Sequence, residues 1–373
     1  MNAKLKHKAI MEDISSENVI NMINTDSQIH TDEQQNVVVY ANPALEQICH
    51  VVLFMEMLYQ QKTQVMPYKL VKITSAQRYQ LANEYRGKID FLKLLNPEVD
   101  SSRYDCAHYD HFMQLWRKMK ITSALFQCQL TEELNINGKT IVVAEYINLL
   151  VSQLWEIVHS PAVKKVMDRR VQQSKHNYFS ACKLVDALVE QYARLMVCRV
   201  DFALKPEYLE GQTVETMHAY LNQLLNNRRG NSLFEHMVGY IIKLEHGEKK
   251  GLHYHCLFLF DGSKVKADAI YAQKIGKYWK EKITRGKGMF YNCNFDKTKY
   301  RKLGIGMINH YEQDKIANLY LVIAYMTKAS QFVMLKTPKN YRCFRRSEMP
   351  NSDYTPSVTR MGRPRRITAT MNG

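Results

Sequence analysis

The chain lacks cysteine pairs at the spacing of a zinc finger or a redox motif. Its eight cysteines stand at positions 49, 106, 128, 182, 198, 256, 293 and 343, and none forms a Cys-x-x-Cys pair. Several lie in apolar surroundings, which favours reduced, buried thiols over a disulfide framework. We therefore expect a protein of the cytosol.

Long apolar runs are also missing. No window approaches the roughly 20 apolar residues of a membrane span. The segment 1–7 lacks the apolar centre of a signal peptide. No internal repeat or low-complexity tract is present. These absences predict a cytoplasmic protein with no membrane partner.

Acidic residues are scarce relative to basic ones. The 373 residues include 36 Asp and Glu against 52 Lys and Arg, giving a net charge of +16. Such a surplus favours a polyanionic partner, because each neutralised phosphate releases counterions. Ribosomal or anionic-membrane partners fit the charge alone equally well. The length suffices for two domains with ordinary cores.

The N-terminal half predicts helices and little chemistry. We expect residues 1–35, which are polar and weakly patterned, to be disordered or loosely helical. Residues 36–190 predict a mainly helical region of unknown role. The helices that its pattern favours span 45–59, 77–95 and 108–120, with a basic amphipathic helix starting at Pro161.

One cluster in this region resembles a metal site. Cys106, His108, Asp110 and His111 offer donors suited to zinc. No second ligand pair stands nearby at finger spacing, and the aromatic neighbours suit the packed start of a helix. Both interpretations stay open, with the helix favoured.

From about residue 190 the pattern becomes regular and predicts an α+β domain. The expected order is strand 194–204, helix 213–227, strands 239–245 and 251–260, helix 266–283, strand 288–295 and helix 315–331. This is the order of a split βαβ, ferredoxin-like antiparallel sheet with helices on one face. It places the central hairpin in the middle of the sheet and leaves the other face free.

The second hairpin strand carries His253 and His255. Successive side chains of a strand point to opposite faces, so both imidazoles share one face. In the simplest hairpin register Glu245 lies opposite His253. Two imidazoles and a carboxylate can hold one divalent ion, Mg²⁺ or Mn²⁺. A His-x-His pair is weak evidence alone, since strand histidines are often bound to backbone groups.

The last predicted helix carries Tyr325 and Lys328, three residues apart and hence neighbours on one face. A phenol beside a cation suits nucleophilic chemistry, although lysines near a helix end are common. Tyr320 lies about 140° around the helix from Tyr325, so we expect no second tyrosine to work with it.

These motifs in this order resemble the HUH endonucleases, which nick single-stranded DNA through a tyrosine. The residues that carry the resemblance are Arg199-Val200-Asp201-Phe202, Gly251-Leu252-His253-Tyr254-His255 and Tyr325-Met326-Thr327-Lys328. The sequences of these motifs most resemble those of the replication proteins of filamentous phages (inoviruses) and their prophage-borne relatives. The resemblance covers residues 191–346, which we expect to form the HUH domain.

The resemblance implies a metal-dependent nickase and strand transferase for rolling-circle replication of a phage or mobile element. Tyr325 would form a 5′-phosphotyrosine intermediate with help from Lys328, and His253, His255 and Glu245 would hold the metal. Asp201 either orients a ligand histidine, pairs with Arg199 or faces solvent. Implied partners are single-stranded DNA, the origin duplex and a host helicase or polymerase.

Basic residues interleaved with aromatic ones predict the DNA contacts. The expected set is Lys274, Lys277, Lys280, Arg285, Lys287, Lys297, Lys299, Arg301 and Lys302, with Arg363 and Arg365 in a basic, flexible tail at 347–373. Cations would meet phosphates, and some of the rings would stack on unpaired bases, although most of them are expected in the core. The interleaved aromatic residues are Tyr271, Tyr278, Trp279, Phe290, Tyr291, Phe295 and Tyr300.

Other functions remain open at this point. The main alternative is a DNA-binding regulator of a prophage without cleavage, followed by a relaxase or transposase of the same superfamily. Two histidines and a carboxylate also make the facial triad of non-haem iron oxygenases. That chemistry gives no reason for Tyr325 or for the basic surplus.

Overall fold

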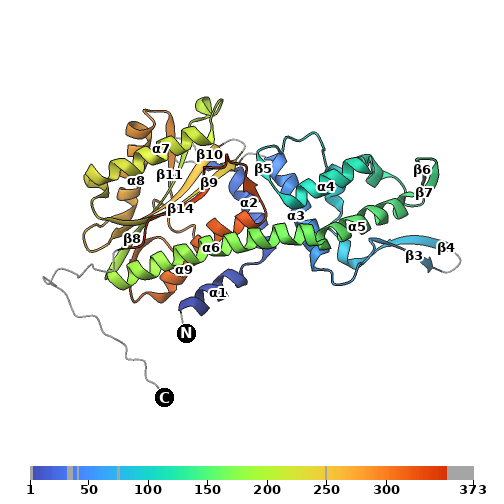
Figure 1. Ribbon diagram of the computed structural model, residues 1–373, viewed down its shortest axis with the longest axis horizontal. Coiled ribbons are helices and arrows are strands. Elements are labelled where there is room, and N and C mark those ends of the chain that lie inside the picture. Colours follow the sequence, from blue (N-terminus) through green and yellow to red (C-terminus); the bar gives the residue numbers. More distant parts are fainter. Residues whose placement is uncertain (1–2, 32–36, 40–41, 74–75, 248–249, 351–373) are drawn as a thin grey trace, which may run out of the picture.

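The computed structural model describes residues 3–31, 37–39, 42–73, 76–247 and 250–350. Within these ranges, none of the helices combines the length and the apolar composition that crossing a bilayer requires. The described chain has a mainly helical N-terminal region and a C-terminal sheet domain, as Figure 1 shows. This is the predicted α+β class.

The sheet domain is built on six antiparallel strands. They are β8 (Arg194–Leu204), β9 (Met237–Gly247), β10 (Gly251–Asp261), β11 (Gly288–Asn292), β12 (Gly306–Asn309) and β14 (Phe344–Arg346). Their order is β11-β8-β10-β9-β14, with β12 also pairing with β8. The four predicted strands are β8, β9, β10 and β11. With α7 (Val214–Asn227) and α8 (Asp268–Tyr278) they follow the split βαβ order, which confirms that prediction. The two outer strands β12 and β14 were not predicted.

Helices cover both faces of the sheet. The face of Phe202, Tyr254 and Phe258 packs on α7, α8 and the π-helical turn Trp279–Ile283. The opposite face packs on α6 (Pro161–Gln191) and α9 (Gln313–Lys328). The expectation of a free second face was therefore wrong. The strands carry apolar residues on both faces of the sheet, and Leu257 and Leu259 on this second face are fully buried.

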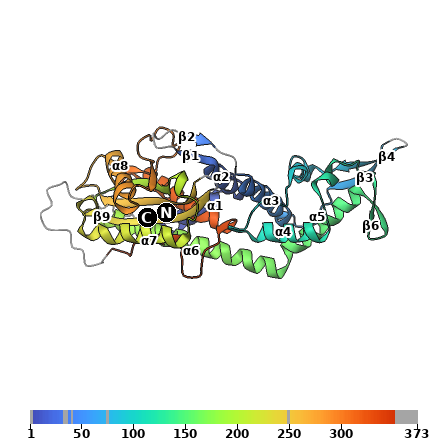
Figure 2. The ribbon, with the colours of Figure 1, turned by 90° about the horizontal axis from the view of Figure 1, so that it is seen from above.

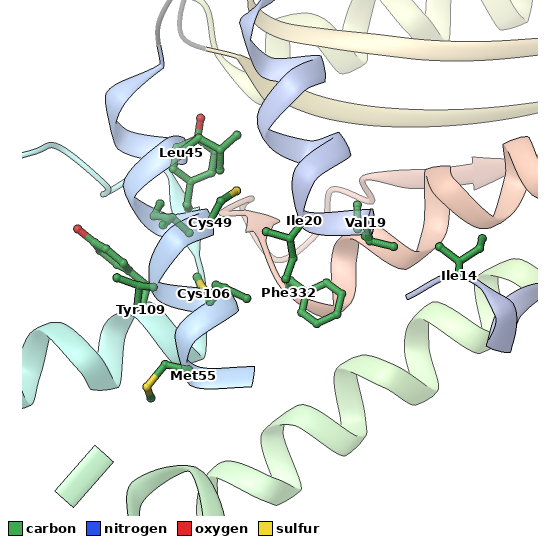
Figure 3. Packing of buried hydrophobic residues seen from close by; sticks show 14 of the residues in the cluster. Ile14, Val19, Ile20, Leu45, Cys49, Met55, Cys106, Tyr109 and Phe332 are labelled. Carbon is green, nitrogen blue, oxygen red and sulfur yellow. The ribbon is translucent and has the colours of Figure 1, made fainter. Parts of the chain in front are cut away.

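The described part of the N-terminus is helical, which favours the helical alternative over disorder. Helices α1 (Ala3–Asp13) and α2 (Ser16–Gln28) pack against α9 and α3. Met11, Val19 and Ile20 of these helices are buried, as is Ile14 between them, and Figure 3 shows Ile20 beside Phe332. The low apolar content concealed these helices because tertiary packing, not composition, stabilises them.

The N-terminal region has three main helices and two β-hairpins. Its elements are α3 (Pro43–Gln60), β3 (Tyr68–Ile73), β4 (Ala76–Leu81), α4 (Ala107–Lys118), β6 (Glu133–Ile136), β7 (Lys139–Val142) and α5 (Val143–His159). A short pair, β1 (Ile29–Thr31) and β2 (Val37–Val39), precedes them. The helix expected over 77–95 is wrong, because its first residues pair with β3 and the rest form 3₁₀ turns.

Helix α6 joins the two regions. It is 31 residues long, about 46 Å at 1.5 Å per residue, and runs along the elongated molecule in Figures 1 and 2. A second link comes from β13 (Met334–Leu335), which pairs with β5 (Tyr104–Asp105) of the N-terminal region and not with the central sheet. One continuous core thus extends from α3 through α6 and α9 to the sheet.

Candidate metal centre

Three adjacent strands bring the predicted ligands together. In the β9–β10 pair His253 lies opposite Glu245, the register expected from the sequence. In the β8–β10 pair His255 lies opposite Asp201. Because side chains alternate along each strand, these four residues occupy one face of the sheet. They stand at the end of the face that α9 covers.

The donor atoms of Glu245, His253 and His255 lie within 4.8 Å of one another. Among the described residues this is the one group of three or more such donors that meets the distance expected of a metal site. Ligands about 2.2 Å from an ion lie up to about 4.4 Å apart, so a contraction of a few tenths of an ångström completes the set. Both imidazoles are buried, at 3% and 6% exposure, and Glu245 is half-buried.

His255 lies between two carboxylates. Its Nδ1 is 3.0 Å from Asp201 Oδ1, and its Nε2 is 3.4 Å from Glu245 Oε2. Burial alone would lower the pKa of His255, but the two carboxylates raise it to about 10. The Nε2 atom is buried and makes no hydrogen bond with any residue in the described part of the chain. A buried nitrogen facing a carboxylate in this way fits a divalent cation.

His253 is oriented by its own strand. Its Nδ1 donates to the Gly251 carbonyl at 3.1 Å, which directs Nε2 away from the backbone. Burial, helped by the nearby His255 charge, lowers the pKa of His253 to about 3. The ring is therefore neutral at physiological pH, the form that binds metals.

Both carboxyl groups are ionised. Burial alone would raise the pKa of Glu245, but its contact with His255 lowers that pKa to about 2. The same opposition holds at Asp201, whose pKa falls well below its usual range because His255 and Arg199 are close. Asp201 contacts both partners that the sequence allowed, with Arg199 Nε at 3.6 Å. An Asp–His pair behind a ligand imidazole is a common arrangement at metal sites.

A cleft of about 680 Å³ opens beside the metal ligands, and Tyr325 lines it together with Glu245 and His255. The Tyr325 ring is half-buried, and its hydroxyl makes no hydrogen bond with the described residues. Tyr320 points elsewhere, as predicted, and its hydroxyl donates to Asp186 of α6 at 2.5 Å. The structure thus brings the predicted nucleophile and two of the three predicted metal ligands, Glu245 and His255, to one cavity.

Lys328 does not line this cleft. Its Nζ donates to the carbonyls of Met11, at 3.0 Å, and Ile14, where α1 ends and α2 begins. Burial lowers the pKa of Lys328. The expectation that Lys328 assists Tyr325 was therefore wrong. One turn of helix separates a residue that faces the cleft from one that anchors the N-terminal helices.

The predicted DNA-binding cations divide into four groups. Lys299, Arg301 and Lys302 line the cleft, and Lys297 instead pairs with Asp268 at 2.9 Å. The cations on α8 and its following turn, on the other side of the sheet from the cleft, are Lys274, Lys277, Lys280, Arg285 and Lys287. Arg363 and Arg365 lie outside the described residues.

Three further residues stand at the site. Arg199, expected only as a partner of Asp201, and Tyr300, expected only as one of the rings among the DNA-binding cations, both line the cleft. The side chain of Lys243, 7% exposed, was not predicted; it shares its face with Glu245, and its Nζ donates to Ser330 Oγ at 2.5 Å. The alternation of side chains along β9, counted from Glu245, would have indicated Lys243.

The cluster around His108 is a packed helix start. His108 Nε2 lies 2.9 Å from Glu56 Oε1 of α3, and Cys106 is buried at the start of α4. Within the described ranges, no third donor completes a metal site there. The structure supports the interpretation that the sequence favoured.

Comparison with known proteins gives one match. No curated protein and no solved structure matches the chain. The model of the YagK/YfjJ C-terminal domain, a family found in prophage-related proteins, matches residues 159–347, just over half of the chain. That range starts just before α6 and contains the six-stranded sheet, the predicted metal ligands and Tyr325. The chain therefore belongs to the YagK/YfjJ C-terminal domain family.

Proposed function

We propose that this protein is a metal-dependent HUH-type endonuclease that nicks and rejoins single-stranded DNA to initiate rolling-circle replication of a phage or another mobile element. The observation that carries the proposal is that Tyr325 lines the same cleft as Glu245 and His255. Sequence motifs some 70 residues apart converge there on one possible chemistry. The occurrence of the family in prophage-related proteins agrees with a mobile element.

Each residue of the site has a role in this chemistry. His253, His255 and Glu245 would hold a divalent ion, Mg²⁺ or Mn²⁺, which would supply polarisation of the scissile phosphate. Asp201 fixes the His255 ring through Nδ1. Cations at the cleft wall, above all Lys299, neutralise the phosphates of the strand.

The reaction is an in-line displacement at phosphorus. The Tyr325 phenolic oxygen forms a bond to phosphorus while the bond from phosphorus to the 3′ oxygen breaks. The phenol loses its proton to solvent, and the leaving oxygen takes one up to become a free 3′-hydroxyl. The 5′-phosphotyrosine conserves the bond energy, so attack by a 3′-hydroxyl reverses the step and rejoins strands.

The architecture argues against the oxygenase alternative. The described strands of the domain form an open sheet with helices on both faces. The cleft beside the ligands is lined by the cations Arg199, Lys299, Arg301 and Lys302, which suit phosphates. A tyrosine at the same cavity adds a nucleophile that an oxygenase does not need.

The test is covalent capture of DNA. The full chain is incubated with single-stranded DNA carrying candidate origins and Mn²⁺, and adducts are resolved by denaturing electrophoresis. We expect an adduct with the parent and with Tyr320→Phe, and none with Tyr325→Phe. Tyr320 is the matched control, because it lies on the same helix and its hydroxyl contacts Asp186.

A second variant separates cleavage from binding. We expect His255→Ala to abolish nicking and to leave duplex binding nearly unchanged. DNA binding without any adduct in the parent would support the non-catalytic prophage regulator. An adduct that persists in Tyr325→Phe would show that another residue is the nucleophile.

A further inference from the structure

The loop between β11 and β12, residues 293–305, forms one wall of the cleft and carries an exposed aromatic ring. Its second half contributes Lys299, Tyr300, Arg301 and Lys302 to the lining. Its first half presents Phe295, whose side chain is 77% exposed. Single exposed apolar residues are common on protein surfaces. Phe295 is unusual in its fixed support and its charged surroundings.

The residue before Phe295 is locked onto the strand that carries Asp201. Asn294 is fully buried, and its side-chain oxygen accepts a hydrogen bond from Arg199 N at 2.7 Å. Its amide nitrogen donates to Val197 O at 2.9 Å and to Asp268 at 2.6 Å. The backbone that supports the exposed ring therefore has a fixed position relative to the metal ligands.

The remainder of the loop is also held. Lys297 pairs with Asp268, and Asp296 accepts hydrogen bonds from the backbone and side chain of Thr298. Farther along, a Cβ at Gly304 would lie 2.5 Å from the backbone of Asn318 in α9. These contacts hold the loop in the conformation that leaves Phe295 exposed.

The charge around the ring suits one kind of occupant. The loop holds four cations and a single acid, Asp296, whose carboxylate is engaged by Thr298. Lys299 Nζ lies over the rings of Tyr291, at 4.2 Å from the centroid, and Tyr300, at 5.2 Å. Cations that follow a backbone, with an aromatic ring beside them, are the pattern of single-stranded nucleic acid binding.

We propose that Phe295 is a stacking platform for an unpaired base of the strand whose phosphates enter the cleft. The subsite extends the proposed function and rests on it. Base stacking on an aromatic side chain changes affinity by about 5- to 150-fold when the ring is removed. A planar side chain at position 295 and a base on the DNA are the two components that the contact requires.

Binding by the full chain tests both components at once. Affinities are measured by fluorescence anisotropy, without added metal, for a short oligothymidylate and for an abasic strand of the same length. We expect Phe295→Ala to bind the oligothymidylate about 5- to 150-fold more weakly than the parent, and Phe295→Trp to retain the affinity. On the abasic strand the parent and Phe295→Ala should bind equally.

The matched control is Tyr311→Ala. Tyr311 is also largely exposed, at 69%, but it precedes α9, whose first residue lies about 18 Å along the helix from Tyr325. We expect Tyr311→Ala to bind the oligothymidylate with the affinity of the parent. Two results would overturn the subsite. One is equal binding of the oligothymidylate by Phe295→Ala and the parent, which would point to a protein that covers Phe295. The other is an equal loss of affinity for the oligothymidylate and for the abasic strand.

The two proposals fail in distinguishable ways. A parent that nicks DNA but shows no effect at Phe295 loses only the stacking subsite. A parent that binds no single strand at all overturns the stacking subsite and the proposed function together. Because binding is measured without cleavage, a nicking failure alone leaves the result at Phe295 decisive.

Discussion

The two regions of the molecule each bury a histidine against a carboxylate, and the pairs differ in how many donors converge. In the N-terminal region, His108 meets Glu56 across two packed helices. In the sheet, His255 lies between Asp201 and Glu245, with His253 beside it. The first is a pair that joins two helices. The second is a set that fits an ion.

The backbone explains the difference. Packed helices are 8–10 Å apart, so side chains meet mainly in pairs across the gap. Neighbouring strands are about 4.8 Å apart and alternate every second residue. Three strands therefore place side chains in adjacent rows. In one row His255 lies between Asp201 and Lys243, and in the next His253 lies opposite Glu245. A cluster of donors in the sequence indicates a metal site more strongly on paired strands than at a helix start.

The largest expected effect is a loss of metal binding when a histidine of the sheet is removed, and no such loss is expected for the histidine of the N-terminal region. His255→Ala removes a ligand, and we expect it to weaken Mn²⁺ binding by at least about 100-fold. His108→Ala should leave Mn²⁺ affinity unchanged and lower the free energy of unfolding by about 1–3 kcal/mol, because Glu56 loses its buried partner. Isothermal titration calorimetry and urea denaturation measure the two quantities.

Each result has a clear contradiction. Parental Mn²⁺ affinity in a folded His255→Ala protein would remove the sheet residues as the metal site. Loss of Mn²⁺ binding in a folded His108→Ala protein would move the site to the N-terminal region.

The second prediction concerns the group behind the ligand. Asp201→Asn keeps the shape and removes the negative charge that faces His255 Nδ1. We expect Mn²⁺ affinity to fall by about 10- to 100-fold. Asp268→Asn is a matched control, because that carboxylate is also largely buried but pairs with Lys297. A similar loss in both variants would indicate a general charge effect.

Much of the sheet domain was predictable because its signals are local. The apolar runs of β8 and β10, the glycine-bounded turn before Gly251 and the capping Thr213 of α7 each lie within a few residues. The errors came where tertiary contacts decide. Residues 77–81 pair with β3, and the hydrogen bonds of Tyr68 to Asn148 hold that hairpin on α5.

The site was predictable to the same extent. Strand periodicity placed His253, His255 and Glu245 on one face. Helical spacing alone could not show that Lys328 would turn toward the carbonyls of Met11 and Ile14, more than 300 residues earlier in the chain. The place of Tyr300 at the cleft could not be predicted, because loop residues follow no period that would indicate where they point.

The third prediction measures that distant contact. Lys328→Met keeps the apolar stem and leaves two buried carbonyls without a donor, so we expect the free energy of unfolding to fall by about 1–3 kcal/mol. Lys315→Met is the control, since it removes a partly exposed ion pair with Glu312 worth at most about 1 kcal/mol. Urea denaturation gives both values.

The same variant separates anchoring from catalysis. Folded Lys328→Met protein should nick DNA at close to the parental rate. Parental stability combined with lost nicking would restore a catalytic role to Lys328, and the N-terminal helices would then need another anchor.

The smallest effect is expected at the thiols, which sample both regions. Cys106 lies at the start of α4, and Cys293 is the first residue of the loop 293–305. Burial raises the pKa of each thiol to about 12. Only about one thiol in 10,000 is then ionised at pH 8, and the thiolate is the reactive form. In a native titration with a disulfide reagent, we expect the half-buried Cys128 and Cys343 to react first and the six buried cysteines only on unfolding. Rapid labelling of Cys293 alone would mean that the cleft wall opens, and rapid labelling of Cys106 would mean that the N-terminal core is the looser of the two regions.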